Sequence, residues 1–275
     1  MNQNLPKFSV LISVYAGDRL DYFKKAMDSI YDQTATPDEI VLVKDGPVSV
    51  EIDDAINEYK QKTDSVLKVV AIEKNKGLGG ALAEGLAQCS YDIIARMDAD
   101  DISASQRFEK QLKFLKDNPD IDVVSCFVAA FDKDPQKPLF FRRGPLEPEQ
   151  IAQQFRFRFC MNHPASMMRK SAIIKAGNYI PFDGLEDYHL WARMLMDGAR
   201  MANIGEVLYY HRWNKGLVKR RGGLKRAALQ IRLQREFLRI GFINKWQFLR
   251  NVAVRTTAAI LPTRVIMRLR IRLGI

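Results

Sequence analysis

An acidic cluster, Asp98, Asp100 and Asp101, follows a short apolar run within four positions. The run, residues 91–97, has the length of a strand. Carboxylates this close repel one another and lose hydration, so a positive partner must offset their charge. Oxygen ligands at a strand end suit Mg²⁺ or Mn²⁺ and leave room for substrate phosphates. The pattern predicts a metal and phosphate site; the alternative is an Asp-rich turn in which Asp101 or Ser103 caps the next helix.

The elements around the acidic cluster alternate between strands and helices. Strand-length apolar runs cover residues 8–14, 39–44, 67–72 and 91–97. Because helices of roughly ten to fifteen residues separate these runs, we expect βαβ units and a mostly parallel sheet over at least residues 5–130. Side chains at the carboxyl ends of neighbouring parallel strands meet at one crevice. Tyr15, Asp45 and the acidic cluster each follow or end a strand, so they are predicted to share that crevice.

Local structure offers a competing explanation for parts of this pattern. Asp45 precedes Gly-Pro and is typical of a turn, and Asp18 is placed to cap the helix after the first strand. The glycines of residues 75–80 (NKGLGG) match neither a P-loop nor a dinucleotide fingerprint. We interpret them as a helix start, or as a place where the backbone passes close to a ligand.

The amino-acid composition is that of an ordinary globular protein. The cysteines and the N-terminal residues predict a cytoplasmic location. The 275 residues are 47% hydrophobic and 27% charged, which supplies enough apolar side chains for a core. The three cysteines form no C-x-x-C pair, which argues against a disulfide framework and favours a reduced protein. The first residues lack a signal-peptide pattern, and no apolar run has the length of a membrane span.

Charge is distributed unevenly between the body of the chain and its C-terminal region. Residues 212–275 contain 17 Lys and Arg against the single acid Glu236, a net +16, whereas residues 1–211 carry −5. An acidic body with a strongly basic tail predicts an anionic partner for the tail, either membrane phospholipid or nucleic acid.

Two amphipathic helices are predicted within the basic tail. The first has an apolar stripe formed by Ala228, Leu229, Leu233, Phe237 and Ile240. The second covers residues 244–260 through Trp246, Leu249, Ala253 and Ile260. Basic helices with Trp and Phe favour binding to an anionic membrane surface. The alternative is that both helices pack on the body and leave only their Lys and Arg rim in water.

The ordered set of motifs resembles that of the inverting glycosyltransferases of family 2. The motifs are SVLISVYAGD, VKDGP, EKNKGLGGALAEGLAQCS, ARMDADD, NHPASMMR, LEDYHLW and KRRGG. Each is weak alone, but together they span most of the chain, and they are most similar to those of bacterial enzymes that build O-antigen, capsule or exopolysaccharide units on a lipid carrier. The resemblance implies a GT-A, Rossmann-like α/β fold: a mostly parallel sheet flanked by helices, with a C-terminal basic amphipathic helical extension.

The resemblance also implies an activity and its donor-side residues. The implied activity is that of a metal-dependent hexosyltransferase, which moves a hexose or N-acetylhexosamine from a nucleoside diphosphate sugar. UDP is the family's usual nucleotide. Asp98-Ala99-Asp100 matches the D-x-D motif, in which the first acid contacts the ribose or uridine and the second holds Mn²⁺ or Mg²⁺ at the diphosphate. Asp45 matches the acid that binds the nucleobase edge, and Tyr15 lies where the family frames the base.

A further donor-side contact is implied at residues 211–212. Some relatives place a His or Arg here that reaches the diphosphate or the cation, so either His211 or Arg212 fits. His211 is the candidate metal ligand. Arg212 is favoured for the diphosphate, because a guanidinium stays charged at every ordinary pH.

The acceptor side is implied by two later motifs. Glu186-Asp187 matches the family's E-D pair, with Asp187 as the general base of a single in-line displacement that inverts the anomeric centre. Acids in the first turn of a helix also stabilise it without any catalytic role. His163 fits the segment that passes the diphosphate and acceptor, and Trp191 fits a wall of the acceptor pocket; structural roles fit both as well. His189, on another face of the same helix, is expected to be structural.

The predicted organisation is a GT-A catalytic domain over residues 1–215 and a basic helical region over residues 216–275. The nucleotide half covers roughly residues 1–130 and the acceptor half roughly residues 131–215. The expected partners are a UDP-sugar, a polyprenyl-diphosphate-linked sugar acceptor and an anionic membrane surface. The protein is accordingly expected in the cytoplasm, bound peripherally to the inner face of the cell membrane.

Other function classes stay open at this point. A nucleic-acid-binding protein would explain the basic tail, although no recognisable nucleic-acid module is present. A sugar nucleotidyltransferase would share the α/β layout and the metal carboxylates, but residues 14–18 lack the expected Gly-rich triphosphate loop. A catalytically inactive family member is disfavoured by the intact Asp98, Asp100 and Asp187.

Overall fold

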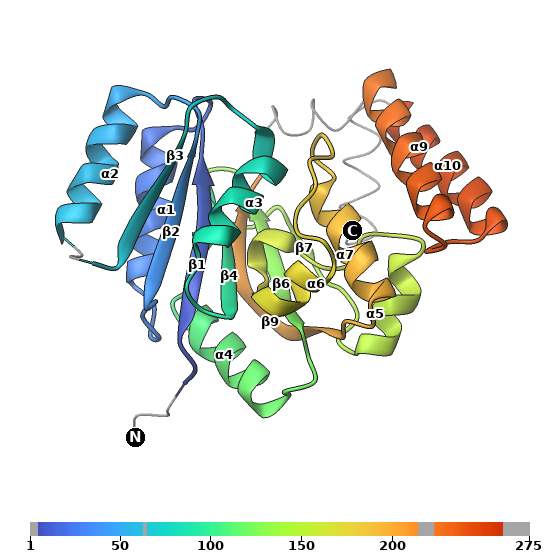
Figure 1. Ribbon diagram of the computed structural model, residues 1–275, viewed down its shortest axis with the longest axis horizontal. Coiled ribbons are helices and arrows are strands. Elements are labelled where there is room, and N and C mark those ends of the chain that lie inside the picture. Colours follow the sequence, from blue (N-terminus) through green and yellow to red (C-terminus); the bar gives the residue numbers. More distant parts are fainter. Residues whose placement is uncertain (1–4, 63–64, 214–222, 261–275) are drawn as a thin grey trace.

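A nine-stranded sheet runs through the chain, and helices cover both of its faces (Figure 1). The computed structural model describes residues 5–62, 65–213 and 223–260. In order across the sheet, the strands are β3 (Leu67–Ile72), β2 (Glu39–Asp45), β1 (Phe8–Val14), β4 (Ile93–Asp98), β8 (Met167–Arg169), β6 (Val123–Phe131), β9 (Met201–Arg212) and β5 (Ile102–Ser103). β7 (Phe140–Arg142) pairs with β6 outside this path. The predicted α/β architecture is therefore confirmed.

The four strands β1 to β4 form the parallel half of the sheet. β1 lies between β2 and β4 and runs parallel to both, and β2 runs parallel to β3. The connecting helices are α1 (Leu20–Tyr31), α2 (Val50–Lys62) and α3 (Gly77–Gln88). The predicted strands agree with these to within two residues at each end. Continuous apolar runs of this length, rich in Val and Ile, are typical of strands buried on both faces.

The remaining strands make the other half of the sheet mixed. β8 is antiparallel to both β4 and β6, and β5 is antiparallel to β9, whereas β6 and β9 are parallel. β8 enters from the short 3-10 turn η1 (His163–Ala165) and not from a crossover helix, so it can reverse direction relative to β4. The prediction of a mostly parallel sheet is therefore correct for β1 to β4, whereas the other strands form a mixed sheet.

Apolar side chains form a core on each face of the sheet. Along β1, Val10 and Ile12 face one core and Leu11 faces the other, which follows the two-residue period of a strand. The first core is covered by α1, α2 and α4 (Arg107–Asp117), and the second by α3, α5 (Pro148–Phe155), α6 (Lys170–Lys175) and α7 (Glu186–Met196). The sheet is thus held rigidly from both sides, which fixes the ends of its strands.

The described part of the basic tail forms two helices that pack against each other at one end of the molecule (Figure 1). They are α9 (Leu224–Arg239) and α10 (Lys245–Ile260). α9 packs inward through Leu233 and Phe237, and the Phe237 ring meets that of Tyr188 in α7 at 5.1 Å between centroids. For α9, the alternative that the helix packs on the body of the protein is confirmed.

The orientation of α10 differs from the alternative in which both helices pack on the body and leave only their Lys and Arg rim in water. Its predicted apolar stripe, which includes Trp246 and Leu249, faces solvent, and Asn251 faces inward. The Asn251 side-chain amide donates to Gln234 Oε1 at 2.9 Å and to the Arg156 carbonyl at 2.7 Å. Turning Asn251 outward would break both hydrogen bonds and remove this donor from the buried Gln234 side chain.

Part of the predicted tail lies outside the described residues, namely residues 216–222 and 261–275. Within the described ranges, no helix combines the length and the apolar character needed to cross a bilayer.

Candidate active site

The carboxyl ends of β1, β2 and β4 lie side by side, as the sequence predicts. Ser13 of β1 pairs with Asp98 of β4, and β1 pairs with β2 in the same direction. Tyr15 follows β1 directly, while Asp45 and Asp98 are the last residues of β2 and β4. The predicted convergence of these residues on one edge of the sheet is therefore confirmed.

The turn after β1 is built differently from the prediction. α1 begins after Arg19 with no side-chain cap, so the predicted cap by Asp18 is wrong. The Asp18 carboxylate instead accepts a hydrogen bond from the Tyr15 backbone amide at 2.9 Å. This contact closes the turn and leaves the Tyr15 ring exposed at the strand end.

Asp45 holds the glycine-rich segment in front of α3. Its Oδ1 accepts from the Lys76 backbone amide at 2.7 Å, and the Asn75 side chain donates to its carbonyl at 3.0 Å. Gly46, which follows, has φ +84°, a conformation that glycine adopts without strain. These contacts agree with the turn interpretation of Asp45, and its contact with a nucleobase stays a prediction.

The same glycine-rich segment brings the two predicted halves together. A Cβ on Gly79 would lie 3.1 Å from both Glu186 Cβ and Pro181 Cα, which is tighter than ordinary packing. Glycine therefore allows the first turn of α3 to lie against the loop that leads into α7. The close backbone approach expected from the NKGLGG motif is made here to the segment that contains Pro181 and Glu186, in the predicted acceptor half.

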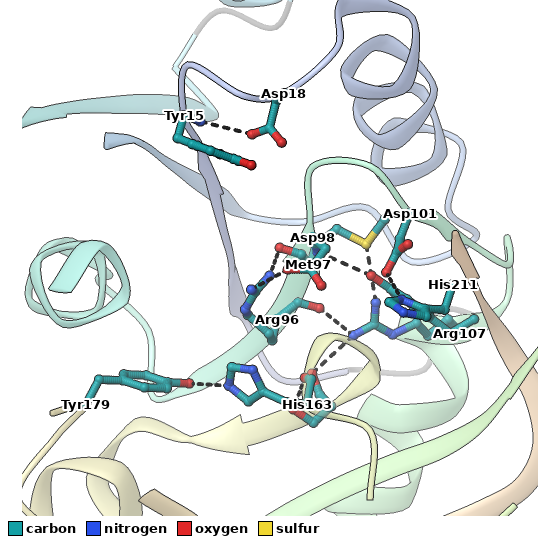
Figure 2. A network of polar contacts seen from close by, with 12 residues as sticks. Tyr15, Asp18, Arg96, Met97, Asp98, Asp101, Arg107, His163, Tyr179 and His211 are labelled. Atoms are coloured by element: carbon teal, nitrogen blue, oxygen red, sulfur yellow. Dashed lines mark hydrogen bonds and ion pairs between the residues drawn. The ribbon is translucent and has the colours of Figure 1, made fainter. Parts of the chain in front are cut away.

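A buried arginine lies beneath the acidic cluster (Figure 2). Arg96, in the middle of β4, donates from Nη2 to Asp98 Oδ1 at 2.5 Å. Burial alone would raise the pKa of Asp98, but the Arg96 charge, with a smaller contribution from His211, lowers it below its usual value. The Asp98 amide donates to the Tyr209 hydroxyl at 3.2 Å. Sequence reasoning missed Arg96, although one charge inside an apolar strand was a usable signal.

Asp100 and Asp101 have different environments. Burial, followed by the charges of Asp101 and Asp98, raises the pKa of Asp100 to about 8. Asp101 is fully buried and accepts from His211 Nδ1 at 2.9 Å and from the Arg212 amide at 2.7 Å. α4 begins after Gln106 without a side-chain cap, so the alternative in which Asp101 or Ser103 caps this helix is wrong.

Asp98, Asp101 and His211 form a group with the composition of a metal site (Figure 2). One ligand atom from each lies within 4.8 Å of the others. Because Asp101 accepts the Nδ1 hydrogen, Nε2 carries the imidazole lone pair, and it is buried without a hydrogen-bond partner among the described residues. An unpaired nitrogen beside carboxylates fits a divalent cation, and a carboxylate behind a histidine is the usual way to orient such a ligand. Asp100 is outside this group, and its role as a ligand stays a prediction.

Arg212 is fixed against the loop that carries the acidic cluster. Its Nε donates to the Asp100 carbonyl at 2.8 Å and its Nη1 to the Asp132 carbonyl at 3.3 Å. The guanidinium lies 3.8 Å from the centre of the Tyr22 ring and 4.6 Å from that of Phe131. Arg212 therefore contributes a positive charge at the correct edge of the sheet, and its contact with a diphosphate stays a prediction.

Glu186 and Asp187 form the first turn of α7. Glu186 is buried and accepts from the Gly184 amide at 2.8 Å through Oε2. Asp187 Oδ1 accepts from the Tyr188 amide at 2.7 Å. Both acids satisfy backbone donors at the start of the helix, as the structural interpretation requires. Glu186 also shapes the turn before Asp187, so it positions the predicted base.

His163 and Trp191 lie in the protein core. His163 Nε2 and the Tyr179 hydroxyl form a hydrogen bond of 2.8 Å, and Trp191 stacks on Phe159 with ring centroids 5.5 Å apart. Both residues are buried, so the structure favours their structural interpretation over direct contact with an acceptor. His189, predicted to be structural, is also buried, against Phe182.

We expect His163→Gln to reduce the loss of stability on acidification. Burial, aided by the Arg96 charge, lowers the pKa of His163 to about 3. The unfolded chain takes up a proton below about pH 6.5 and the folded protein does not, so stability falls as the pH drops below 6.5. Between pH 6.5 and 5, this contribution is about 2 kcal/mol.

Urea denaturation at pH 7 and pH 5 checks this expectation. The variant should be less stable at pH 7, because it loses the bond to Tyr179, yet it should lose about 2 kcal/mol less than the parent on going to pH 5. Equal losses in the two proteins would contradict the expectation.

Known protein sequences similar to this chain are glycosyltransferases. Residues 9–177 match the family "Glycosyl transferase family 2". A UDP-Gal:alpha-D-GlcNAc-diphosphoundecaprenol beta-1,3-galactosyltransferase from Escherichia coli is 36% identical over 96% of this chain and 94% of its own. The amylovoran biosynthesis glycosyltransferase AmsE from Erwinia amylovora is 34% identical over 94% of this chain and 96% of its own.

Solved structures show the same architecture at low sequence identity. The mannosyltransferase PcManGT from Pyrobaculum calidifontis, in complex with GDP-Man and Mn²⁺, matches with a TM-score of 0.62 and 17% identity, over 98% of this chain and 80% of its own. Residues 1–349 of S. aureus TarS, in complex with UDP-GlcNAc, match with a TM-score of 0.66 and 18% identity, over 84% of this chain and 66% of that one. These likenesses confirm the predicted GT-A fold.

Proposed function

This chain belongs to glycosyl transferase family 2, and from that premise we propose that it moves a hexose or N-acetylhexosamine from a UDP-sugar to a lipid-linked glycan acceptor in surface polysaccharide synthesis. The observation that carries the proposal is the similarity, over nearly the full length of both chains, to a galactosyltransferase whose name specifies UDP-Gal and a GlcNAc-diphosphoundecaprenol acceptor. Family membership disfavours both the nucleic-acid-binding and the nucleotidyltransferase alternatives.

On the donor side, Asp100 and His211 are the proposed ligands of Mn²⁺ or Mg²⁺, and we add Asp98, which shares a ligand group with His211. When bound, the cation supplies a Lewis acid that offsets the charge of the leaving diphosphate. Asp101 positions His211, because its carboxylate accepts from Nδ1 and leaves Nε2 without a hydrogen-bond partner among the described residues. Arg212 adds a permanent positive charge for the diphosphate.

The nucleoside is assigned to the ends of β1 and β2. Tyr15 frames the base with its exposed ring, and Asp45 accepts from the nucleobase edge. Asp45 is suited to this task because its carboxylate is already held by the Lys76 amide, so little ordering is needed on binding. Asp98 contacts the ribose in addition to its part in the cation site.

On the acceptor side, Asp187 is the proposed general base. The acceptor oxygen forms a bond to the anomeric carbon as the bond from that carbon to the diphosphate breaks, and the hydroxyl proton passes to the Asp187 carboxylate. Inversion agrees with the β linkage named for the E. coli relative, since UDP-galactose is α-linked. A lipid-linked acceptor places the reaction at the cytoplasmic face of the membrane, to which the protein binds peripherally.

Calorimetric titration with UDP and with GDP, each with and without Mn²⁺, is the first test of this function. We expect UDP to bind in the presence of Mn²⁺ and GDP to bind weakly. Incubation with UDP-Gal, UDP-Glc or UDP-GlcNAc and a synthetic GlcNAc-diphosphate lipid should then give a product heavier by one sugar in mass spectrometry. Binding of GDP alone would overturn the UDP assignment, and binding of neither nucleotide would overturn the donor site.

A further inference from the structure

α10 lies at one end of the molecule (Figure 1). Its outward side presents apolar side chains to solvent. Trp246, Leu249 and Val254 are 65%, 66% and 56% exposed. With Arg250 and Ala253, they fall within an arc of about 140° at 100° per helical residue. We call these five residues the α10 outer face.

The α10 outer face is not a misplaced part of the core. The opposite side of the helix is already held, since Asn251 bonds to Gln234 and to the Arg156 carbonyl. Arg255 donates to Gln230 Oε1 at 3.1 Å and to the Tyr188 hydroxyl at 2.9 Å. These polar contacts fix the rotation of α10, so the exposed Trp and Leu have no place inside the fold. Large apolar side chains gathered on one surface mark a contact with another phase or partner.

The positive charge of α10 distinguishes among the possible partners of the α10 outer face. α10 has Lys245 and Arg250 beside the apolar side chains of the outer face and contains no acidic residue, and it lies within the region of net charge +16. A second copy of the chain on this face would bring two such regions together, which like-charge repulsion opposes. A nucleic acid would pair with Lys and Arg but leave the Trp, Leu and Val uncovered. An anionic bilayer complements both the apolar and the basic side chains, because its acyl chains bury the apolar side chains and its phosphates pair with the cations.

We propose that the α10 outer face docks on an anionic phospholipid bilayer. Trp246 and Leu249 enter the boundary between headgroups and acyl chains, and Lys245 lies at the lipid phosphates. Arg250, whose Nη1 donates to Asn251 Oδ1 at 3.3 Å, adds positive charge beside these apolar side chains. This assignment rests on the lipid-linked acceptor of the proposed function, and it names the surface that brings the enzyme to that acceptor.

Tryptophan fluorescence gives a selective test of this docking. The sequence has three tryptophans. Trp191 and Trp213 are buried, whereas Trp246 is largely exposed, so Trp246 dominates any change caused by lipid. The full chain should show a blue shift of emission with vesicles of phosphatidylcholine and phosphatidylglycerol, and quenching by lipids brominated near the headgroup. Pure phosphatidylcholine vesicles should have little effect, and added salt should weaken the shift.

Substitution with vesicle sedimentation provides the second measurement. Trp246→Ser and Leu249→Ser should each lower the partition coefficient about tenfold or more. Val50→Ser, at a 72% exposed valine on α2, is the matched control and should leave partition unchanged. Both α10 variants should keep their thermal unfolding temperature, because neither side chain is part of the core.

The possible outcomes separate docking from the proposed function. Unchanged partition of both variants, or sedimentation with no shift of Trp246 emission, would overturn the proposal and assign anchoring to another part of the chain. A blue shift that grows with protein concentration in the absence of lipid would identify a second copy as the occupant. Since Mn²⁺–UDP binding is measured without lipid, its failure would count against the donor site and leave docking unaffected.

Discussion

Asp187→Asn is expected to lower kcat for sugar transfer by about a hundredfold to ten-thousandfold, because the acceptor hydroxyl loses its proton acceptor. Binding of Mn²⁺–UDP should be unchanged, since Asp187 is assigned to the acceptor side. Asparagine keeps a side-chain oxygen that can accept from the Tyr188 amide, so the first turn of α7 should remain formed. Initial rates with a synthetic lipid-linked acceptor, together with calorimetric titration of UDP, give the two readouts.

The matched control for this substitution is Asp183→Asn, four positions earlier, in the loop that leads into α7. Asp183 is an exposed acid whose contact with Arg232 is a surface ion pair at 3.5 Å, so its loss should change the rate little. Full activity of Asp187→Asn would exclude it as the base. If the variant instead unfolds at ordinary temperature, the helix-terminus interpretation of Glu186 and Asp187 gains support.

The second large effect is expected at the acidic cluster. Asp98→Asn and Asp100→Asn should each weaken Mn²⁺-dependent UDP binding by about a hundredfold or more, because the diphosphate loses the cation that offsets its charge. Asp101→Asn should cost about tenfold to a hundredfold, because it releases His211 from its orientation. Calorimetry with Mn²⁺ and UDP, and electron paramagnetic resonance of Mn²⁺ alone, measure these losses without requiring turnover.

The pattern of losses also decides which carboxylates bind the ion. A loss of Mn²⁺ affinity in Asp98→Asn but not in Asp100→Asn would move the ligand role to the group that contains Asp98, Asp101 and His211. Retention of Mn²⁺-dependent binding in all three variants would contradict a metal site at this edge of the sheet. Asp183→Asn again serves as the control for removal of an acidic charge outside the acidic cluster.

The parallel half of the fold could be predicted because its signals are local. The strands β1 to β4 are mainly apolar runs, and β1, β2 and β4 lead directly into Tyr15 or end in Asp45 and Asp98. Asp45 and Asp98 were found in this way, since the carboxyl ends of parallel strands meet whatever helices connect them. The mixed half gave no such signal, because β8 has only three residues and its direction depends on the path of the preceding loop.

The parts of the site that were missed depend on contacts between distant positions. Asp101 looked like a helix cap in its local context, but its partner is His211, 110 residues away. The Trp246 stripe of α10 was compatible with a membrane surface or with the body of the protein. The structure leaves it exposed, because Asn251 on the other side is held by residues of α9 and of the segment after α5. A buried amide with partners outweighs the apolar pattern of a helix, and those partners are invisible in the local sequence.

The bond from Arg255 to the Tyr188 hydroxyl has a thermodynamic consequence, because it joins the helix proposed to meet the bilayer to the residue next to the proposed base. If binding of α10 to the bilayer favours the position of α7 in which Asp187 can bind the acceptor, then lipid binding and acceptor binding share a coupling free energy. Such coupling is reciprocal: the factor by which vesicles tighten acceptor binding equals the factor by which acceptor tightens vesicle binding. A water-soluble acceptor fragment would then hold the enzyme more firmly on a membrane that contains no acceptor at all.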